Sequence, residues 1–252
     1  MVNIIMHGCN GHMGQVISDI VNKDETCQIV AGIDPFVDAK QNNYPVFASI
    51  NDCDVAADVI IDFSTAKAVD TLLTYSKEKK IPVVLCTTGL TPKQLELVDE
   101  TSKEVAILRS ANMSLGVNTI MKLVAEAAKV LANAGFDIEI VEKHHNQKLD
   151  APSGTAIALA DSINDAMDHS YEYIYDRSDR RQKRDAKELG ISAVRGGTIV
   201  GEHEVLFCGT DEVVEIKHTA YSKAIFAKGS VQAAKFLAGK DAGLYQMSDV
   251  IG

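Results

Sequence analysis

Short apolar runs and longer amphipathic stretches alternate along the first part of the chain. The runs are rich in valine and isoleucine, which favours buried strands, whereas the stretches between them repeat apolar residues at helical spacing. The predicted strands cover residues 2–6, 27–33, 57–61, 82–86 and 105–108. Because apolar strands that alternate with helices are typical of a parallel sheet covered on both faces, residues 1–114 are predicted to form a Rossmann-like, doubly wound α/β domain.

The pattern changes after about residue 114. A long helix with one apolar stripe is predicted over residues 117–134. The segments that then alternate apolar with polar residues are 136–143, 191–194, 204–208 and 212–218. Such alternation is typical of strands whose two faces meet different surroundings, so residues 115–223 are predicted to form an α+β domain with a mainly antiparallel sheet. In the tail, residues 233–237 and 239–250 look helical, and residues 224–252 are expected to pack back on the first domain.

Composition and charge narrow the function classes. The 252 residues carry 25 Lys and Arg against 35 Asp and Glu, and the net charge of −10 argues against a binder of nucleic acid or of anionic membranes. No apolar run approaches the roughly 20 residues that a membrane helix needs, and the N-terminus lacks the pattern of a signal peptide. The five cysteines are scattered, and no two have CxxC spacing. We therefore expect a cytoplasmic protein with reduced thiols and no metal site.

A glycine-rich turn follows the first predicted strand. Gly8, Gly11 and Gly14 lie between that strand and a predicted helix, where glycines let the backbone approach a pyrophosphate and the helix N-terminus supplies N–H donors. Asp34 ends the second predicted strand, where a carboxylate can accept hydrogen bonds from a ribose diol. This context predicts dinucleotide binding by the first domain. The alternative is a structural glycine turn in a domain without a nucleotide, with Asp34 capping a loop.

A second motif, residues 142–155, runs from a strand end to a helix start. A serine or threonine there can cap the helix, and its free N–H groups can hold a carboxylate. His144, His145 and Lys148 add up to three positive donors beside that anion site, an arrangement that suits a small dianionic substrate. Paired histidines also suggest zinc, but no third ligand stands at metal spacing and the lysine would repel the ion. The remaining alternative is a surface loop with incidental histidines.

Three other kinds of segment have weaker signals. Residues 86–89 and 110–113 follow predicted parallel strands at the edge where open α/β sheets bind ligands, although alone each is better explained as an ordinary turn. Residues 195–204 are a glycine-punctuated connection that is either functional or a tight turn fixing strand register. Residues 177–187 mix many basic residues with acids, and we interpret them as solvated surface rather than as a nucleic-acid contact.

The motif at residues 142–156 resembles the signature E-x-H-H-x-x-K-x-D-A-P-S-G-T-A of the dihydrodipicolinate reductase family of the diaminopimelate and lysine pathway. The similarity extends in order along the whole chain. It includes the N-terminal GxxGxMG, the TTG turn, and residues 111–118, 194–197 and 201–203. The His-His…Lys…Asp-Ala-Pro-Ser-Gly-Thr string is long and specific.

The resemblance implies a reductase that delivers hydride from NADH or NADPH to ring C4 of 4-hydroxy-tetrahydrodipicolinate, with loss of water and formation of tetrahydrodipicolinate. It implies that His144 and Lys148 are the acid–base pair. The substrate contacts that it implies are His145, Ser153, Gly154 and Thr155. The cofactor contacts that it implies are Gly8, Cys9, Asn10, Gly11, His12, Met13, Asp34, Cys86, Thr87, Thr88, Ser110, Ala111, Asn112 and Met113. The family also suggests a homotetramer built through the sheet of the second domain.

Three positions depart from the family pattern: Cys86 stands where Gly is common, Met113 where Phe is common and Lys223 where Arg is common. The chemistry agrees with the motif, because hydride addition to an unsaturated nitrogen ring builds negative charge that a histidine or lysine can protonate. Two alternatives stay open. One is another two-domain nicotinamide oxidoreductase, such as an amino-acid dehydrogenase. The other is an NAD-sensing module without catalysis, which has no need for the histidine–lysine cluster.

Two finer expectations concern the cofactor and the assembly. NADH should serve at least as well as NADPH, because residues 34–38 hold two acids and no base where a 2′-phosphate needs Arg or Lys. His12 stands where an arginine would help to hold phosphate, and Lys40 is a nearby base, so dual use stays open. A homotetramer is expected because the second domain has too few helices to cover both faces of its sheet.

Overall fold

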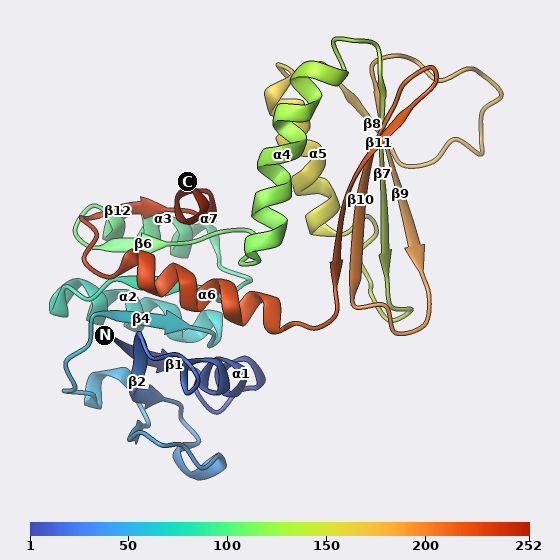
Figure 1. Ribbon diagram of the computed structural model, residues 1–252. Helices are drawn as coiled ribbons and strands as arrows, with labels where there is room; N and C mark the ends of the chain where they lie inside the picture. Colours follow the sequence, from blue (N-terminus) through green and yellow to red (C-terminus); the bar gives the residue numbers. More distant parts are fainter. The chain divides into compact units, whose positions relative to one another are not determined.

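A computed structural model describes residues 1–252, and the chain divides into two compact units. The first unit comprises Met1–Leu115 together with Ala224–Gly252, and the second comprises Gly116–Lys223. The C-terminal segment therefore belongs to the first unit, although the second unit lies between the two parts in the sequence (Figure 1).

The first unit is built on a sheet of seven strands, all paired in parallel. The strands are β1 (Val2–His7), β2 (Cys27–Ile33), β3 (Val46–Phe47), β4 (Val59–Asp62), β5 (Val83–Leu85), β6 (Ala106–Leu108) and β12 (Gly243–Tyr245). Their order in the sheet is β12-β6-β5-β4-β1-β2-β3. The chain thus moves outward from β1 in both directions, which is the arrangement of a doubly wound fold.

Helices cover both faces of this sheet (Figure 1). They are α1 (His12–Val21), α2 (Ala66–Lys79), α3 (Pro92–Ser102), α6 (Ala224–Leu237) and the short α7 (Met247–Ile251), with single 3-10 turns at Val37–Ala39 and Ile50–Asp52. Successive strand residues point to opposite faces, so Ile4 of β1 packs in the core with α1 and α6, whereas Ile5 packs with α2 and α3. Both faces are apolar, which is why these strands read as continuous hydrophobic runs.

Two short strands of the first unit were not predicted from the sequence pattern. Val46–Phe47 extends the sheet beyond β2, and Gly243–Tyr245 pairs in parallel with β6 inside the tail that was expected to be helical. That expectation is wrong for residues 239–246, which are not helical, and α6 is much longer than predicted. Strands this short have no periodicity of their own; they form because a neighbouring strand offers its hydrogen bonds.

The second unit contains a five-stranded sheet in the order β11-β10-β7-β9-β8. The strands are β7 (Asp137–His144), β8 (Glu172–Ile174), β9 (Glu188–Arg195), β10 (Gly201–Cys208) and β11 (Val213–Ala220). Strand β10 is antiparallel to both β7 and β11, whereas β9 is parallel to β7 and to β8. The predicted fold class is confirmed, but the sheet is mixed rather than mainly antiparallel, because a helical crossover returns the chain in the direction of β7.

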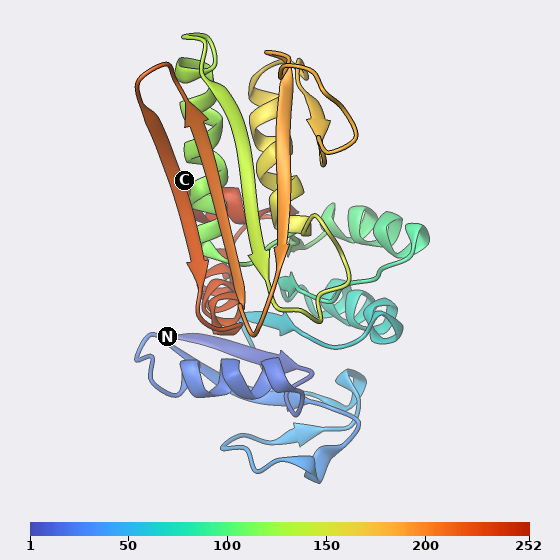
Figure 2. The ribbon, with the colours of Figure 1, turned by 90° about the vertical axis from the view of Figure 1, so that its right-hand side faces the viewer.

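Helices α4 (Leu115–Leu131) and α5 (Gly154–Ala166) both lie against one face of this sheet (Figures 1 and 2). Strand residues on that face, such as Ile140 and Phe207, pack with Val124 of α4 and Leu159 of α5. No helix covers the other face. It carries charged as well as apolar side chains, so the sheet has one dry face and one mixed face, as its alternating sequence predicts.

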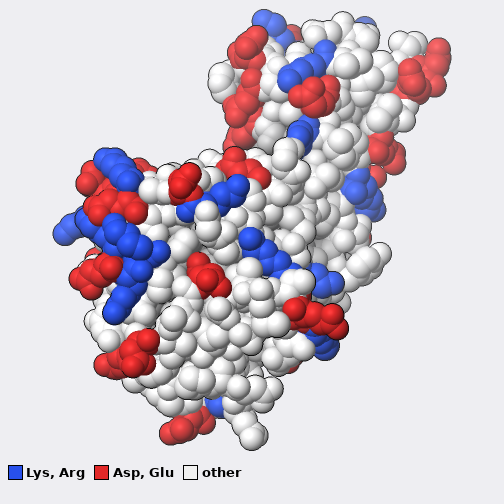
Figure 3. Space-filling model, turned by 60° about the vertical axis from the view of Figure 1, so that its left-hand side comes forward, with Lys and Arg blue, Asp and Glu red and all other residues white.

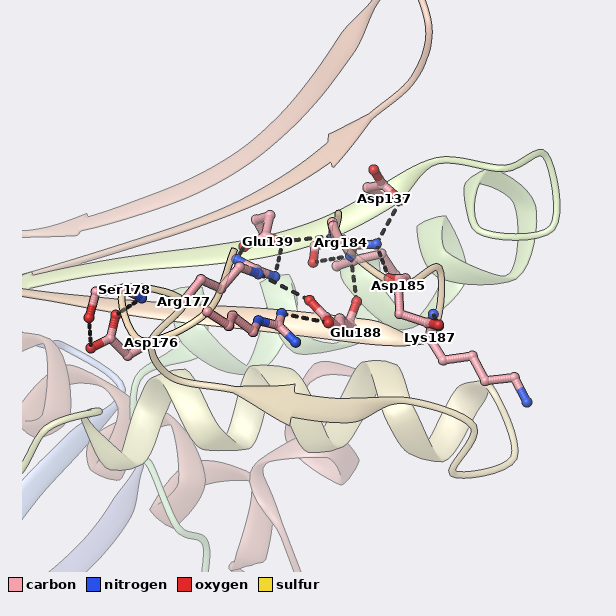
Figure 4. A network of polar contacts seen from close by, with 11 residues as sticks. Asp137, Glu139, Asp176, Arg177, Ser178, Arg184, Asp185, Lys187 and Glu188 are labelled. Carbon is pink, nitrogen blue, oxygen red and sulfur yellow. Dashed lines mark hydrogen bonds and ion pairs between the residues drawn. The ribbon is translucent and has the colours of Figure 1, made fainter. Parts of the chain in front are cut away.

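The basic segment before β9 is organised on the mixed face rather than simply solvated, so that interpretation is corrected (Figure 4). Arg177 and Arg184 both bind Glu139 of β7, with nitrogen–oxygen distances of 2.8 and 2.9 Å. Arg177 also pairs with Glu188 at 3.0 Å. Gly190 makes room for this cluster, because a Cβ there would lie 1.9 Å from a Glu139 carboxylate oxygen. The arginines thus fasten a long connection to the sheet.

No helix of the structure combines the length and the apolar character needed to cross a membrane. On the face that Figure 3 shows, basic and acidic side chains are interspersed and no broad basic patch forms.

Candidate active site

The glycine turn stands at the carboxyl end of β1, against neighbouring backbone. Gly8 has a φ of +83°, and a Cβ on it would lie 2.4 Å from the carbonyl oxygen of Phe63. A Cβ on Gly14 would lie 2.3 Å from the carbonyl oxygen of Gly8. The turn leads into α1, whose N-cap residue Gly11 makes no side-chain hydrogen bond to the first turn. Only glycine fits at these closest approaches, and the helix start is left open for an anion.

Asp34 fastens this turn to the end of β2. Its side chain is buried, and its two oxygens accept the N–H groups of Asn10 at 3.1 Å and Phe36 at 3.0 Å. An ionised carboxylate has about four acceptor positions, so lone pairs remain for a ribose diol. The contact with Phe36 matches the loop-capping role that the sequence left as an alternative, whereas the contact with Asn10 of the glycine turn was not predicted.

An amide cluster around Asn10 was missed by the sequence analysis. The Asn10 side chain donates to the Phe36 carbonyl at 2.7 Å and accepts from the side chain of Asn42 at 2.8 Å. The Gln15 amide joins the Asn42 side chain at 2.9 Å and the Cys9 carbonyl at 3.0 Å. These amides connect the glycine turn with the loop after β2. No short sequence motif predicts them, because their residues lie far apart in sequence.

A buried His7–Asp62 pair was also missed. Nδ1 of His7 lies 2.7 Å from an oxygen of Asp62, at the carboxyl ends of two adjacent strands. The same oxygen accepts the N–H of Ser64, and that N–H also approaches the Thr87 hydroxyl at 3.1 Å. The predicted contact Thr87 therefore lies at the same sheet edge as the glycine turn.

The remaining predicted cofactor residues also follow strands of this sheet. Cys86, Thr87 and Thr88 come directly after β5, and Ser110, Ala111, Asn112 and Met113 come just after β6. His12 is exposed at the start of α1 and Met13 is half-buried beside it. The side chains of Cys9 and Met113 are buried in the core, so only their main chain is available to a ligand. Burial, helped by Asp34, raises the pKa of the Cys9 thiol to about 12, which leaves it unreactive.

These residues fit a nicotinamide dinucleotide. The positions where a Cβ would collide with backbone form a cradle of main chain at the start of α1, and Asp34 stands at the end of the next strand. The turns after β5 and β6 complete the same edge. In open parallel sheets this is the edge at which such ligands bind.

The second site begins where β7 ends. His144 is the last residue of that strand, with only 8% of its surface exposed. Its Nδ1 lies 2.7 Å from an oxygen of Glu142, which is completely buried. Burial alone would raise the pKa of Glu142, but hydrogen bonds from Arg195, His144 and the Ser153 N–H outweigh it and lower the pKa. The strand therefore carries an ionised carboxylate into the protein interior.

Ser153 joins this pair to the start of α5 and to β10. Its N–H donates to Glu142 at 2.9 Å, and its hydroxyl accepts from the Ala156 N–H at 3.1 Å as the helix N-cap. The hydroxyl also lies 2.8 Å from Nε2 of His203, whose ring stands edge-on to that of His144 at 5.1 Å. Burial, followed by the charge of His144, lowers the pKa of His203 to about 4, so this ring stays neutral at physiological pH.

Lys148 lies in the loop between β7 and α5 and pairs with Asp150 at 2.8 Å. The carbonyl of Asp150 accepts a hydrogen bond from Arg195 at 2.6 Å, and the charge of Lys148 acts on His203. The structure thus brings Lys148 into the same cluster as His144. Of the other predicted substrate residues, His145 starts the loop, and Gly154 and Thr155 form the first turn of α5, with open space around Gly154.

Glu142, Arg195 and His203 were not assigned a role from the sequence, although each lies in a motif that resembles the family. Their signal is visible only after strand pairing, because β9 places Arg195 opposite His144 and β10 places His203 opposite Glu142. No group of three or more His, Cys, Asp or Glu residues is arranged to hold a metal ion.

A doubly wound parallel sheet with a glycine turn, together with a second unit that carries a buried cluster of histidine, glutamate and arginine side chains, defines a two-domain nicotinamide-dependent oxidoreductase. Two family models match the chain. Residues 2–113 match dihydrodipicolinate reductase, N-terminus, and residues 116–251 match dihydrodipicolinate reductase, C-terminus. The chain therefore belongs to the dihydrodipicolinate reductase family.

Curated relatives agree along the whole length. The chain is 49% identical over 251 residues to 4-hydroxy-tetrahydrodipicolinate reductase of Caldanaerobacter subterraneus subsp. tengcongensis, covering 100% of this chain and 98% of the relative. It is 50% identical over 251 residues to the enzyme of the same name from Clostridium novyi, again covering 100% and 98%. The resemblance inferred from the sequence is confirmed.

Solved structures share the fold. A dipicolinate-bound dihydrodipicolinate reductase from a Paenisporosarcina species superposes with a TM-score of 0.81 at 23% identity, covering 98% of this chain and 97% of the other. The DAP dehydrogenase of Corynebacterium glutamicum in complex with DAP has a TM-score of 0.56 at 10% identity, covering 100% and 95%. The amino-acid dehydrogenase alternative thus shares the architecture, whereas the sequence relatives are reductases.

Proposed function

We propose that this protein reduces 4-hydroxy-tetrahydrodipicolinate to tetrahydrodipicolinate, with loss of water, using NADH or NADPH. The reaction is a step of diaminopimelate and lysine biosynthesis. Similarity to enzymes of that name over the full chain supports the substrate. The observation in the structure that carries the proposal is the buried His144–Glu142 pair beside the N-terminus of α5.

The second unit has the chemistry that a cyclic dicarboxylate requires. One carboxylate would lie at the N-terminus of α5, near Gly154 and Thr155, where the helix dipole favours an anion. The other would pair with Lys148 or His145, which supply charged or polar donors from the adjacent loop. In this assignment Lys148 leaves Asp150 for the substrate, which is a small cost because Asp150 is largely exposed.

His144 and Lys148 are the proposed acid–base pair. The nicotinamide supplies a hydride to ring C4 when it is bound, and the substrate then carries negative charge that must be protonated. His144 holds one proton on Nδ1 against Glu142, so Nε2 is the atom that can exchange a second. Lys148 places a positive charge in the same cluster and stabilises negative charge as it develops.

For the cofactor we propose that NADH is used at least as well as NADPH. Asp34 is fixed at the end of β2 by two backbone N–H groups, so its carboxylate cannot easily turn away from a 2′-phosphate. Asp38 and Lys40 are both exposed in the loop that follows, and the base leaves room for some use of NADPH. The contacts proposed for the glycine turn and for the turns after β5 and β6 are those predicted from the sequence.

We also propose that the protein is a cytoplasmic homotetramer. The face of the second sheet that no helix covers carries half-buried Val141 and Leu206, with exposed Val194 and Val213 nearby. Lys143, Glu202 and Lys217 form ion pairs on the same face. A mixed face of this kind suits association with a second copy through apolar and charged contacts.

The test is to mix the protein with NADH or NADPH and freshly generated 4-hydroxy-tetrahydrodipicolinate. Oxidation of the cofactor is monitored as the loss of absorbance of its reduced form. We expect oxidation only when enzyme, cofactor and substrate are all present. Oxidation without the substrate, or none with it, would contradict the proposal. Mass measurement by light scattering at micromolar protein tests the tetramer, which a monomer would refute.

A further inference from the structure

Glu142 is a charged residue with no exposed surface, and its carboxylate is fully occupied. One oxygen accepts from a guanidinium nitrogen of Arg195 at 2.7 Å and from the Ser153 N–H at 2.9 Å. The other accepts from a second nitrogen of Arg195 at 2.7 Å and contacts Nδ1 of His144 at 2.7 Å. Burying a carboxylate is costly unless it is paired and fully hydrogen-bonded, and this carboxylate meets both conditions.

The contacts fix where the proton of His144 resides. An ionised carboxylate can only accept, so the hydrogen between the two groups belongs to Nδ1 of His144. Nε2 is then the nitrogen with a free lone pair in the neutral ring. Gly201 of β10 stands beside that nitrogen, and a Cβ there would approach Nε2 to 3.1 Å. The absent side chain keeps the reacting side of the ring from being crowded.

We propose that Glu142 and Arg195 are positioning residues for His144, which they hold in one ring orientation and one tautomer with Nε2 as the acid–base atom. This inference rests on the proposed function of His144. Arg195 contributes by keeping Glu142 in place with a two-pronged contact, which a planar guanidinium can make and an ammonium cannot. Neither residue needs to touch the substrate for this role.

Arg195 also connects the two members of the acid–base pair. Nη2 of Arg195, one of the two nitrogens that bind Glu142, also donates to the Asp150 carbonyl at 2.6 Å. The Asp150 carboxylate in turn pairs with Lys148 at 2.8 Å. The main-chain N–H of Gly196 donates to the carbonyl of His144 at 2.9 Å, so the end of β9 supports the end of β7 directly. One arginine therefore orders the strand end and the loop together.

The charged and titratable groups around His144 come from five segments. Glu142 stands on its own strand, Arg195 on β9, His203 on β10 and Lys148 in the loop before α5. His218 of β11 stands in register with His203. Glu142 is the only anion in direct contact with the ring, so its removal should disfavour the charged imidazolium.

The test compares Glu142→Gln with Glu139→Gln. Both glutamates lie on β7 and both bind arginine, Glu142 through two contacts and Glu139 through three. Glu139 lies on the opposite face of the sheet, with Arg177 and Arg184 (Figure 4). A glutamine has one acceptor oxygen for the four donor nitrogens at position 142. In Glu142→Gln we expect kcat to fall about 100-fold with a change in KM below about threefold, and the pH profile of kcat/KM to move to lower pH. Glu139→Gln should lose stability without either change.

Nitrogen-15 spectra of the histidine rings give a readout that does not depend on turnover. Neutral His144 should carry its proton on Nδ1 in the unaltered protein and in Glu139→Gln, and should populate the Nε2–H tautomer in Glu142→Gln. If Glu142→Gln does not fold, Arg195→Lys takes its place, with about a tenfold loss of kcat expected.

Three results would overturn the proposal: an Nε2–H tautomer in the unaltered protein, an unchanged tautomer in Glu142→Gln, or parallel behaviour of the two glutamine variants in kcat and pH profile. A failure of the proposed function is distinguishable from these. In that case the unaltered protein does not reduce the substrate at all, while the tautomer measurement still reports on Glu142 and Arg195.

Discussion

The two units build their sites from different parts of the chain. In the first unit, main chain makes the site: Gly8 and Gly14 admit a close backbone approach, and α1 offers its uncapped start. In the second unit, buried side chains make it, with the Glu142 carboxylate in direct contact with both Arg195 and His144. We therefore expect the first site to be disrupted by substitutions that add a side chain at a glycine, and the second by substitutions that remove a charge.

This difference reflects the two tasks. A dinucleotide brings its own reactive group, so the protein needs only to bind and orient it. The substrate must receive a proton and have its carboxylates neutralised, which requires ionisable groups with fixed positions and charges. Fixing such groups requires a buried charge, Glu142, whose removal from water is unfavourable for folding.

The largest effect should come from removing a charge in the second unit. Lys148→Ala is expected to lower kcat by at least about 100-fold, the scale of a lost acid–base or charge-stabilising group. Binding of NADH, measured by fluorescence, should survive because the glycine turn belongs to the other unit. Lys143→Ala is the control, since Lys143 pairs with Glu202 on the opposite face of the same sheet. Near-normal turnover in Lys148→Ala would remove Lys148 from the mechanism.

A second effect concerns the pH dependence of folding. Burial lowers the pKa of His203 to about 4, against an ordinary value of 6.5. Between pH 4 and pH 6.5, His203 therefore binds a proton in the unfolded chain but not in the folded protein. This contribution to stability is complete above pH 6.5 and is lost as the pH falls through 4, with a total on the order of 3 kcal/mol.

Urea unfolding at several pH values checks this expectation. His203→Gln should flatten the decline in the free energy of unfolding between pH 6.5 and 4. His169→Asn is the control, because His169 is exposed and its positive φ is one that asparagine tolerates. An equally steep decline in His203→Gln would show that other groups govern acid unfolding.

In the first unit the sharpest change is Gly14→Ala, which adds one carbon. That carbon would lie 2.3 Å from the Gly8 carbonyl oxygen and 2.6 Å from that of Cys9, both of them backbone atoms that cannot move aside easily. We expect a loss of about 2 kcal/mol in the free energy of unfolding and weaker NADH binding. Gly196→Ala, with no atom within 4 Å of the new carbon, should unfold like the unaltered protein. Equal stability of the two variants would refute the steric explanation.

The smallest effect is the choice between cofactors. An Asp34 carboxylate a few ångströms from a 2′-phosphate should cost about 1 kcal/mol or more at an effective dielectric constant near 20, or roughly fivefold in kcat/KM. Asp34→Ser should shift the ratio of the two kcat/KM values toward NADPH. A tenfold preference for NADPH in the unaltered enzyme would show that Lys40 or another base governs this pocket.

Local patterns predicted the parts that depend on neighbours in sequence. The Rossmann-like sheet, the glycine turn and the position of Asp34 follow from strand, turn and helix signals within single segments. The strands at 46–47 and 243–245 could not be predicted, because they exist only through pairing with β2 and β6.

The same limit explains what was missed at the second site. His144 and Lys148 share one motif, whereas Arg195 reaches Glu142 across two strands that are 53 residues apart in sequence. A buried ion pair is indistinguishable from two surface charges until the register is known. The basic segment before β9 was misread for this reason, since its partner Glu139 lies on β7.

The most direct test follows the hydride itself. The enzyme is given NADH that carries deuterium at the transferable position of the nicotinamide, together with freshly generated 4-hydroxy-tetrahydrodipicolinate, and the product is analysed by mass spectrometry and NMR. The proposed reaction predicts tetrahydrodipicolinate with one deuterium at ring C4, formed in step with cofactor oxidation and strongly reduced in Lys148→Ala. Cofactor oxidation with no deuterium in the ring, or a label at another carbon, would contradict it.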